Sequence, residues 1–154
     1  MAKITLIQPP YTIYRDSALS FFLVMPSVGL AYLATSLKSE GHELSVIDAV
    51  GEALHNFVDL PGKPYFLQGL NFDEVVDRIP ANTEVIGVTY MFSNEWYIQK
   101  SLVTRIKERR PDVKIVLGGE AASADAEFIL RSEIGVDFCV IGEGEETFGE
   151  LVAA

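Results

Sequence analysis

The stretch at residues 114–123, KIVLGGEAAS, constrains the fold more than any other part of the chain. It contains a run of apolar β-forming residues, which is typical of a strand buried on both faces of a parallel sheet. The run stops at Gly118 and Gly119, which leave room at the C-terminal end of the strand. In open α/β sheets, ligands bind at that end of the strands. The sequence therefore predicts a sizeable ligand at this edge.

Further strands are predicted at residues 3–8 (KITLIQ), 43–49 (ELSVIDA), 85–90 (VIGVTY) and from 138 (FCVIGEG). Helices are predicted from Ser27 to Gly41, from Asn71 to Pro80, from Ser93 or Asn94 to Pro111, from Ser123 or Asp125 with Phe128 and Ile129 facing inward, and from residues 142–147 (GEGEET) onward. This alternation indicates a doubly wound α/β fold of the flavodoxin-like or Rossmann-like kind. We expect a five-stranded parallel sheet of order 2-1-3-4-5, with right-handed crossovers and helices on both faces.

Two predicted loops on the ligand side of the sheet are longer than usual, at residues 9–25 and 51–70. The first loop contains several aromatic residues and an uncharged segment at 19–25. This segment either packs as core or as a lid, or it faces a ligand or another domain.

Composition limits the classes of function. The chain has 154 residues, 49% of them hydrophobic, which suits one domain with a single core, and its net charge of -10 argues against binding to a phosphate backbone. The basic residues Lys107, Arg109 and Arg110 end a predicted helix, where they complement the helix dipole. We therefore expect no nucleic-acid partner.

The predicted location is the cytoplasm. A single cysteine excludes an intramolecular disulfide, and a strand beginning at Lys3 leaves no room for a signal peptide. The uncharged segment 19–34 is interrupted by Pro26 and Gly29, and it is shorter than the roughly 20 apolar residues of a membrane span. No membrane insertion is expected.

Several ligand classes lack their sequence signals. The turn after the first strand, QPPYTIY, has no glycine, which argues against a dinucleotide site. A phosphorylated receiver domain requires Asp after strand three and Lys after strand five, where this chain has Thr89-Tyr90 and Ile141-Gly142. P-loop, HExxH and CxxC motifs are absent, so we predict no catalytic or metal-ligating residue. A flavin domain, with Tyr11, Tyr90 and Phe92 stacking on the ring, and a scaffold without a cofactor remain alternatives.

Four segments together resemble one known family. They are PSVGLAYLATSLKSEGHELSVID at 26–48, VIGVTYM at 85–91, KIVLGGEAAS at 114–123 and VDFCVIGEGEETFGEL at 136–151. In this order and spacing they resemble the N-terminal cobalamin-binding domain of cobalamin-dependent radical S-adenosylmethionine (SAM) enzymes. The resemblance covers almost the whole chain.

The resemblance implies that residues 1–154 are one cobalamin-binding domain excised from a longer protein. The parent would carry a C-terminal radical SAM domain with a four-iron four-sulfur cluster and SAM, and it would catalyse methyl transfer or related radical chemistry. The cluster's cysteines are not in this chain, so the resemblance implies a binding module without turnover of its own.

The resemblance also implies where cobalamin binds. Thr89-Tyr90-Met91 is a relaxed form of the family's Ser-x-Leu, and Gly118-Gly119 matches its Gly-Gly; both make room for the nucleotide tail of the cofactor. The Asp-x-His-x-x-Gly motif that supplies a cobalt ligand in other branches is missing after strand one, which implies cobalamin without a protein histidine ligand. The candidate cofactor-binding residues are Pro10, Tyr11, Asp48, Thr89, Tyr90, Met91, Phe92, Ser93, Gly118, Gly119, Ser123, Gly142, Glu143 and Gly144.

Some of these candidates also have purely structural interpretations. The two glycines could form only a tight turn, Asp48 could cap a turn, and Glu143 could favour a helix N-terminus. Cys139 lies in an apolar strand and is expected in the core. Of the two histidines, His42 is expected at the opposite edge of the sheet and His55 in a solvated loop.

Overall fold

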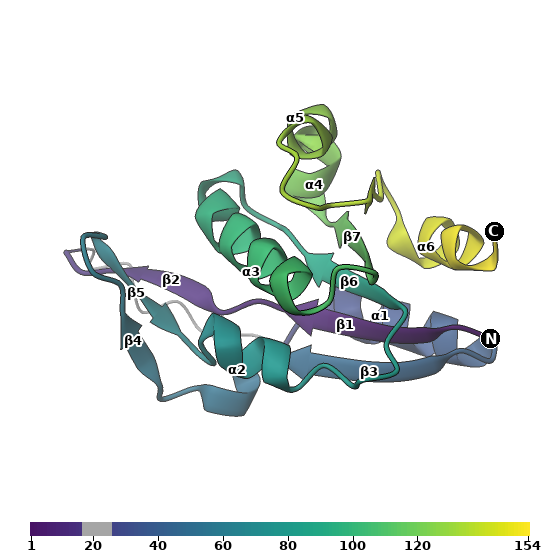
Figure 1. The fold of residues 1–154 in the computed structure, drawn as a ribbon, viewed down its shortest axis with the longest axis horizontal. Coiled ribbons are helices and arrows are strands. Elements are labelled where there is room, and N and C mark those ends of the chain that lie inside the picture. The colour runs from purple at the N-terminus through teal and green to yellow at the C-terminus, as the bar shows by residue number, and fades with distance from the viewer. Residues whose placement is uncertain (17–25) are drawn as a thin grey trace.

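The computed structural model describes residues 1–16 and 26–154 and is built around a five-stranded parallel sheet (Figure 1). Its strands are β1 (Lys3–Gln8), β3 (Glu43–Asp48), β6 (Val85–Thr89), β7 (Lys114–Gly118) and β8 (Phe138–Cys139). Their order, β3-β1-β6-β7-β8, is the predicted order 2-1-3-4-5. The predicted fold class is therefore confirmed, while the predicted lid or pocket segment 19–25 lies outside the described residues.

Helices cover both faces of this sheet, as predicted. They are α1 (Val28–Ser39), α2 (Phe72–Asp77), α3 (Trp96–Arg109), α4 (Glu120–Ala124), α5 (Ala126–Arg131) and α6 (Gly144–Ala153). Two predicted N-caps are confirmed: the Ser27 side chain accepts a hydrogen bond from the Leu30 amide, and Asn71 forms a capping box with Glu74. Gly41, with φ of +88°, follows the end of α1.

Two predicted details near helix starts are wrong, and a third is confirmed. Neither Ser93 nor Asn94 caps α3, because both lie in the 3-10 turn η2 (Ser93–Glu95) that precedes it. The predicted helix start at Asp125 is confirmed, because Asp125 occupies the N-cap position of α5, whose Ile129 is buried. The short helix α4, which begins at Glu120 directly after the glycines, was not predicted. Phe128 is 57% exposed instead of facing inward, and its ring packs edge-on against Trp96 at 5.1 Å between ring centroids.

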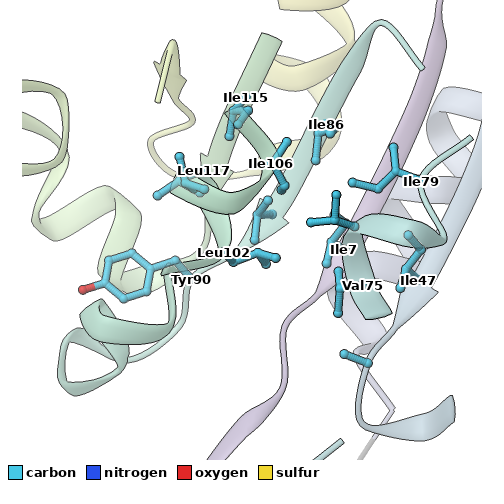
Figure 2. Close-up of a cluster of buried hydrophobic side chains, with 14 of the residues drawn as sticks. Ile7, Ile47, Val75, Ile79, Ile86, Tyr90, Leu102, Ile106, Ile115 and Leu117 are labelled. Carbon is cyan, nitrogen blue, oxygen red and sulfur yellow. The ribbon is translucent and has the colours of Figure 1, made fainter. Parts of the chain in front are cut away.

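Side chains that alternate along the strands form two separate cores. Ile7, Ile86 and Ile115 face α2 and α3 in the larger core, which Figure 2 shows together with Leu102 and Ile106 of α3. The next residues along the same strands face the other way. Leu6 and Val116 pack there with residues of α1 and α6, including Leu30, Leu37 and Phe148.

A second sheet projects beyond the C-terminal ends of the parallel strands (Figure 1). It is antiparallel, of order β2-β5-β4, and consists of β2 (Tyr11–Tyr14), β5 (Tyr65–Gln68) and β4 (Phe57–Asp59). The prediction of loops at residues 9–25 and 51–70 is therefore wrong where these strands form. A 3-10 turn, η1 (Gly51–Ala53), connects β3 to this region.

Candidate functional site

The predicted site residues lie on the loops that follow the parallel strands. Pro10 and Tyr11 follow β1, Asp48 ends β3, Thr89 to Ser93 end and follow β6, Gly118 and Gly119 end and follow β7, and Gly142 to Gly144 follow β8. Ser123 lies in α4, and its hydroxyl accepts a hydrogen bond from the Gly142 amide at 3.1 Å. The order reverses between β1 and β6, so this edge is also the topological switch point, where such folds bind ligands.

The two glycines after β7 have different roles. A Cβ atom on Gly118 would meet only Val140, at 3.9 Å, so the space beside this residue is open. A Cβ atom on Gly119 would lie 2.7 Å from the Tyr90 carbonyl oxygen and 2.8 Å from Met91 Sδ, and Gly119 has φ of +114°. Gly119 is therefore required by the backbone of the protein itself. Gly118 is the glycine that leaves room for something else.

Gly118 borders a narrow groove between the parallel sheet and the helices α1 and α6, which we call the α1/α6 groove. Its volume is about 40 Å³, and its lining is mostly apolar. The lining residues are Leu6, Leu30, Leu33, Gly87, Val88, Thr89, Val116, Gly118 and Phe148. Ligand pockets for drug-sized molecules usually measure roughly 300–1,000 Å³, so a large ligand group requires α1 or α6 to move outward.

Gly87 and Phe148 were missed by the sequence analysis. A Cβ atom on Gly87 would lie 3.0 Å from Cε2 of Phe148, so this glycine lets the ring approach the sheet and close the groove. Phe148 is only 3% exposed. An isolated glycine inside a strand pattern signals a close approach, and Gly87 in VIGVT carries that signal.

Tyr90, a predicted site residue, does not present its ring at the surface. It is 1% exposed and belongs to the core on the α2/α3 side (Figure 2). Its hydroxyl donates a hydrogen bond to the Ser93 carbonyl oxygen at 3.2 Å. Burial, followed by the charge of Asp125, raises the pKa of Tyr90 to about 12, so the phenol stays protonated. Its neighbours Met91 and Phe92 are 41% and 62% exposed and give the rim an apolar surface.

A polar cluster lies on the other side of the switch point, near the start of α3. Burial, followed by the charges of Glu95 and Asp48, raises the pKa of Tyr11. Burial alone raises the pKa of Glu95 to about 7. Asp48 also has the structural role considered above, since its Oδ1 accepts a hydrogen bond from the Gly51 amide at 2.9 Å. Glu95 is not among the predicted site residues, because nothing in the sequence indicates that its side chain is buried.

Asp137 fixes the start of β8 and thereby the loop that contains Gly142 to Gly144. Its carboxylate accepts hydrogen bonds from the Ile115 amide and from Lys107 Nζ, both at 2.9 Å, and from Lys114 Nζ at 3.1 Å. Burial would raise the pKa of Asp137, but these hydrogen bonds and charges outweigh it and lower the pKa. Glu143, within this loop, is exposed and makes no capping bond to α6.

The described residues offer an apolar groove and no cluster of metal-ligating side chains. Within residues 1–16 and 26–154, no group of three or more His, Cys, Asp or Glu side chains is placed to hold a metal. His42 lies at the N-terminal edge of the sheet, where its Nδ1 accepts a hydrogen bond from the Ala2 amide at 3.1 Å. By contrast, the open space beside Gly118 leads into the apolar α1/α6 groove. In the same described part of the chain, no helix combines the length and apolar character needed to cross a bilayer.

Comparison with curated proteins finds two methyltransferases and a cyclase. The chain is 27% identical, over 95% of its length, to cytidylyl-2-hydroxyethylphosphonate methyltransferase of Streptomyces wedmorensis, and covers 27% of that protein. It is 29% identical, over 99% of its length, to an uncharacterized methyltransferase of Pyrococcus horikoshii, and covers 29% of it. It is 28% identical, over 84% of its length, to anaerobic magnesium-protoporphyrin IX monomethyl ester cyclase of Synechocystis, and covers 23% of it. The chain thus spans about a quarter of the length of these relatives.

Solved structures confirm the fold. A cobalamin-binding protein from Desulfitobacterium hafniense superposes with a TM-score of 0.61 at 16% identity, over 99% of this chain and 57% of that one. A CheY-like receiver domain from Methanospirillum hungatei gives a TM-score of 0.55 at 14% identity, over 99% of this chain and 92% of that one. Similarity at this level of identity concerns the fold alone.

The chain also matches the model of one protein family. The model of the B12 binding domain matches residues 14–152, which is most of the chain. The matched range includes the loops after β6, β7 and β8 and every lining residue of the α1/α6 groove except Leu6. This match agrees with the resemblance found in the four sequence segments. The chain belongs to the B12-binding domain family.

Proposed function

We propose that this chain binds cobalamin as a module of a larger radical SAM enzyme, with the nucleotide tail in the α1/α6 groove and the corrin ring over the rim formed by the loops after β1, β6 and β7. The observation that carries the proposal is the open space beside Gly118 at the mouth of an apolar groove, in a chain that matches the B12 binding domain. When bound, cobalamin supplies the cobalt chemistry used for methyl transfer.

Different residues of the chain would bind different parts of cobalamin. The small residues Gly118 and Thr89 admit the tail at the groove, and the apolar lining excludes water from it. The exposed side chains Met91 and Phe92 offer the corrin an apolar support. Ser123 of α4, together with Gly142, Glu143 and Gly144 at the start of α6, would bind the periphery of the cofactor.

The parent protein would supply the remaining half of the pocket. Because the chain covers about a quarter of its curated relatives, a C-terminal radical SAM domain with its iron–sulfur cluster and SAM has room in a protein of their length. A doubly wound domain holds its ligand from one rim only. We therefore expect the 154-residue chain to bind cobalamin more weakly than the whole parent, and to have no turnover alone.

Titration of the chain with hydroxocobalamin, followed by visible absorption and equilibrium dialysis, tests the proposal. We expect saturable binding and a spectrum that His42→Ala and His55→Ala leave unchanged, because His42 is at the far edge of the sheet. Absence of saturable binding would favour the cofactor-free scaffold. A spectral change in either variant, or an imidazole nitrogen signal in electron paramagnetic resonance of the cobalt(II) form, would contradict ligation without histidine.

A further inference from the structure

The α1/α6 groove is too small for the aromatic base at the end of the nucleotide tail. Its volume is about 40 Å³. A benzene molecule, which is smaller than a benzimidazole base, occupies an apolar protein cavity of roughly 150 Å³. Part of the groove lining must therefore move before the base can enter.

Most of the lining is fixed, because it belongs to the parallel sheet. Six of the nine lining residues lie on β1, β6 and β7. Each of these strands is hydrogen-bonded to a neighbouring strand on both sides. The remaining lining residues are Leu30 and Leu33 of α1 and Phe148 of α6. The groove therefore widens only when one of these two helices moves outward.

The helix α1 is anchored at both of its ends. Ser27 caps its start, and the side chains of Leu30 in the first turn and Leu37 in the last turn are buried, 8% and 0% exposed. Beyond its end, the His42 amide donates a hydrogen bond to the Leu37 carbonyl oxygen at 3.2 Å, directly before β3 begins. Moving α1 would expose both leucines to water, so this helix resists displacement.

The helix α6 is held less firmly at its N-terminal end. No side chain caps its start, and a Cβ atom on Gly142 or Gly144 would meet nothing within 4 Å, so the chain is loosely packed at these positions. The Gly142 amide is tied to the Ser123 hydroxyl. Of the residues in α6, all of which the structure describes, only Phe148 and Gly149 are buried. The Phe148 ring is therefore the main anchor of this end of the helix.

The place that the Phe148 ring occupies also suits another flat aromatic group. A Cβ atom on Gly87 would lie 3.0 Å from Cε2 and 3.2 Å from Cζ of Phe148, so the ring lies directly against the bare backbone of β6. A benzimidazole is flat and largely apolar, like a phenyl ring, and the same surface can bury it. The base and the Phe148 ring cannot occupy this place together.

We propose that the nucleotide tail displaces the Phe148 ring from the α1/α6 groove, and that Phe148 thereby determines how tightly and how fast the chain binds a corrinoid that has a tail. This inference rests on the proposed function. The N-terminal end of α6 would tilt outward, while Gly149 stays against Glu40 at the end of α1; a Cβ atom on Gly149 would lie 2.8 Å from Oε2 of Glu40. Because the ring must leave before the tail binds, the apparent affinity is reduced to the fraction of molecules whose groove is open.

Replacing Phe148 by Leu tests the proposal, because Leu keeps an apolar side chain on α6 but fills less of the groove. We expect Phe148→Leu to bind cobalamin at least about fivefold more tightly than the wild type, since the groove is open in a larger fraction of the molecules. The affinity for cobinamide, which has the corrin ring but no nucleotide tail, should stay within about twofold of the wild type. Equilibrium dialysis measures these constants, and a cooperative thermal melt shows that the variant is folded.

Phe72→Leu is the matched control. It makes the same substitution in the core on the other face of the sheet, against which Phe72 packs. It should leave the affinities for both ligands within about twofold of the wild type.

The rate of binding provides a second test that needs no variant. After rapid mixing of the wild-type chain with increasing concentrations of cobalamin, the observed rate should level off at the rate at which the groove opens. With cobinamide the observed rate should keep rising in proportion to the ligand concentration. Phe148→Leu should raise the limiting rate for cobalamin.

The proposal is overturned if Phe148→Leu binds cobalamin no more tightly than the wild type, because the ring would then not compete with the tail. An equal gain in affinity for cobalamin and cobinamide would place the effect outside the tail and would also overturn it. A wild-type rate that rises linearly with cobalamin concentration would do the same. Failure of the wild-type chain to bind either ligand would instead overturn the proposed function, and this inference with it.

Discussion

Replacing Gly118 by Leu is expected to weaken cobalamin binding at least about a hundredfold, a loss of about 2.7 kcal/mol. The new side chain would enter the mouth of the α1/α6 groove, whose volume is about 40 Å³, and occupy the space proposed for the nucleotide tail. The backbone of Gly118 lies outside the left-handed region, and its Cβ position is open, so the domain should still unfold cooperatively. Equilibrium dialysis with cobalamin and a thermal melt measure the two effects.

Gly118→Ala is the control for this variant. A single methyl group would meet only Val140 at 3.9 Å, so Ala should bind within about threefold of the wild type. Gly119 is unsuitable for this test, since any side chain there strains the protein's own backbone at φ of +114°. If Gly118→Leu bound cobalamin as well as Gly118→Ala, the tail would not occupy this groove.

Truncating Phe148 to Ala is expected to lower the free energy of unfolding by about 3–5 kcal/mol. The ring is 3% exposed and joins α6 to the smaller core, in contact range of Gly87 and Leu6. Removal of the ring leaves a cavity beside the α1/α6 groove, which Phe148 lines. Urea denaturation followed by circular dichroism measures the change.

Phe138→Ala provides the comparison, because Phe138 is 41% exposed on the edge strand β8. It should lower the free energy of unfolding by no more than about 1 kcal/mol. Equal losses in the two variants would show that Phe148 does not hold α6 against the sheet.

The order of the parallel sheet was predictable because each of its strands carries its own local signal. Apolar runs such as residues 114–118 are continuous, and glycine or proline marks their ends. The second sheet gives no such signal. Tyr11–Tyr14 pairs with Tyr65–Gln68, far along the chain, and each strand is too short to show a clear alternation. Strands β4 and β5 are neighbours along the chain, but β2 forms only through pairing with the distant β5.

The sequence predicted which loops form the candidate site, but not which of their residues contact one another. The apolar runs and the residues that end them predict where the strands stop, and therefore the positions of Thr89, Gly118 and the loop after β8. The sequence could not separate Gly118 from Gly119, because the difference lies in contacts with Tyr90 and Met91 across the sheet. It also could not identify Glu95, whose properties arise from burial between segments that meet only in the folded chain.

The central claim is that the α1/α6 groove takes the nucleotide tail of cobalamin. Cobinamide has the same corrin ring but lacks this tail, so comparing the two ligands tests whether the chain binds the tail. We predict that the chain binds cobalamin at least about tenfold more tightly than cobinamide, a difference of about 1.4 kcal/mol, and that Gly118→Leu abolishes the difference. Equal affinity of the wild-type chain for the two ligands, measured by equilibrium dialysis under the same conditions, would contradict the claim.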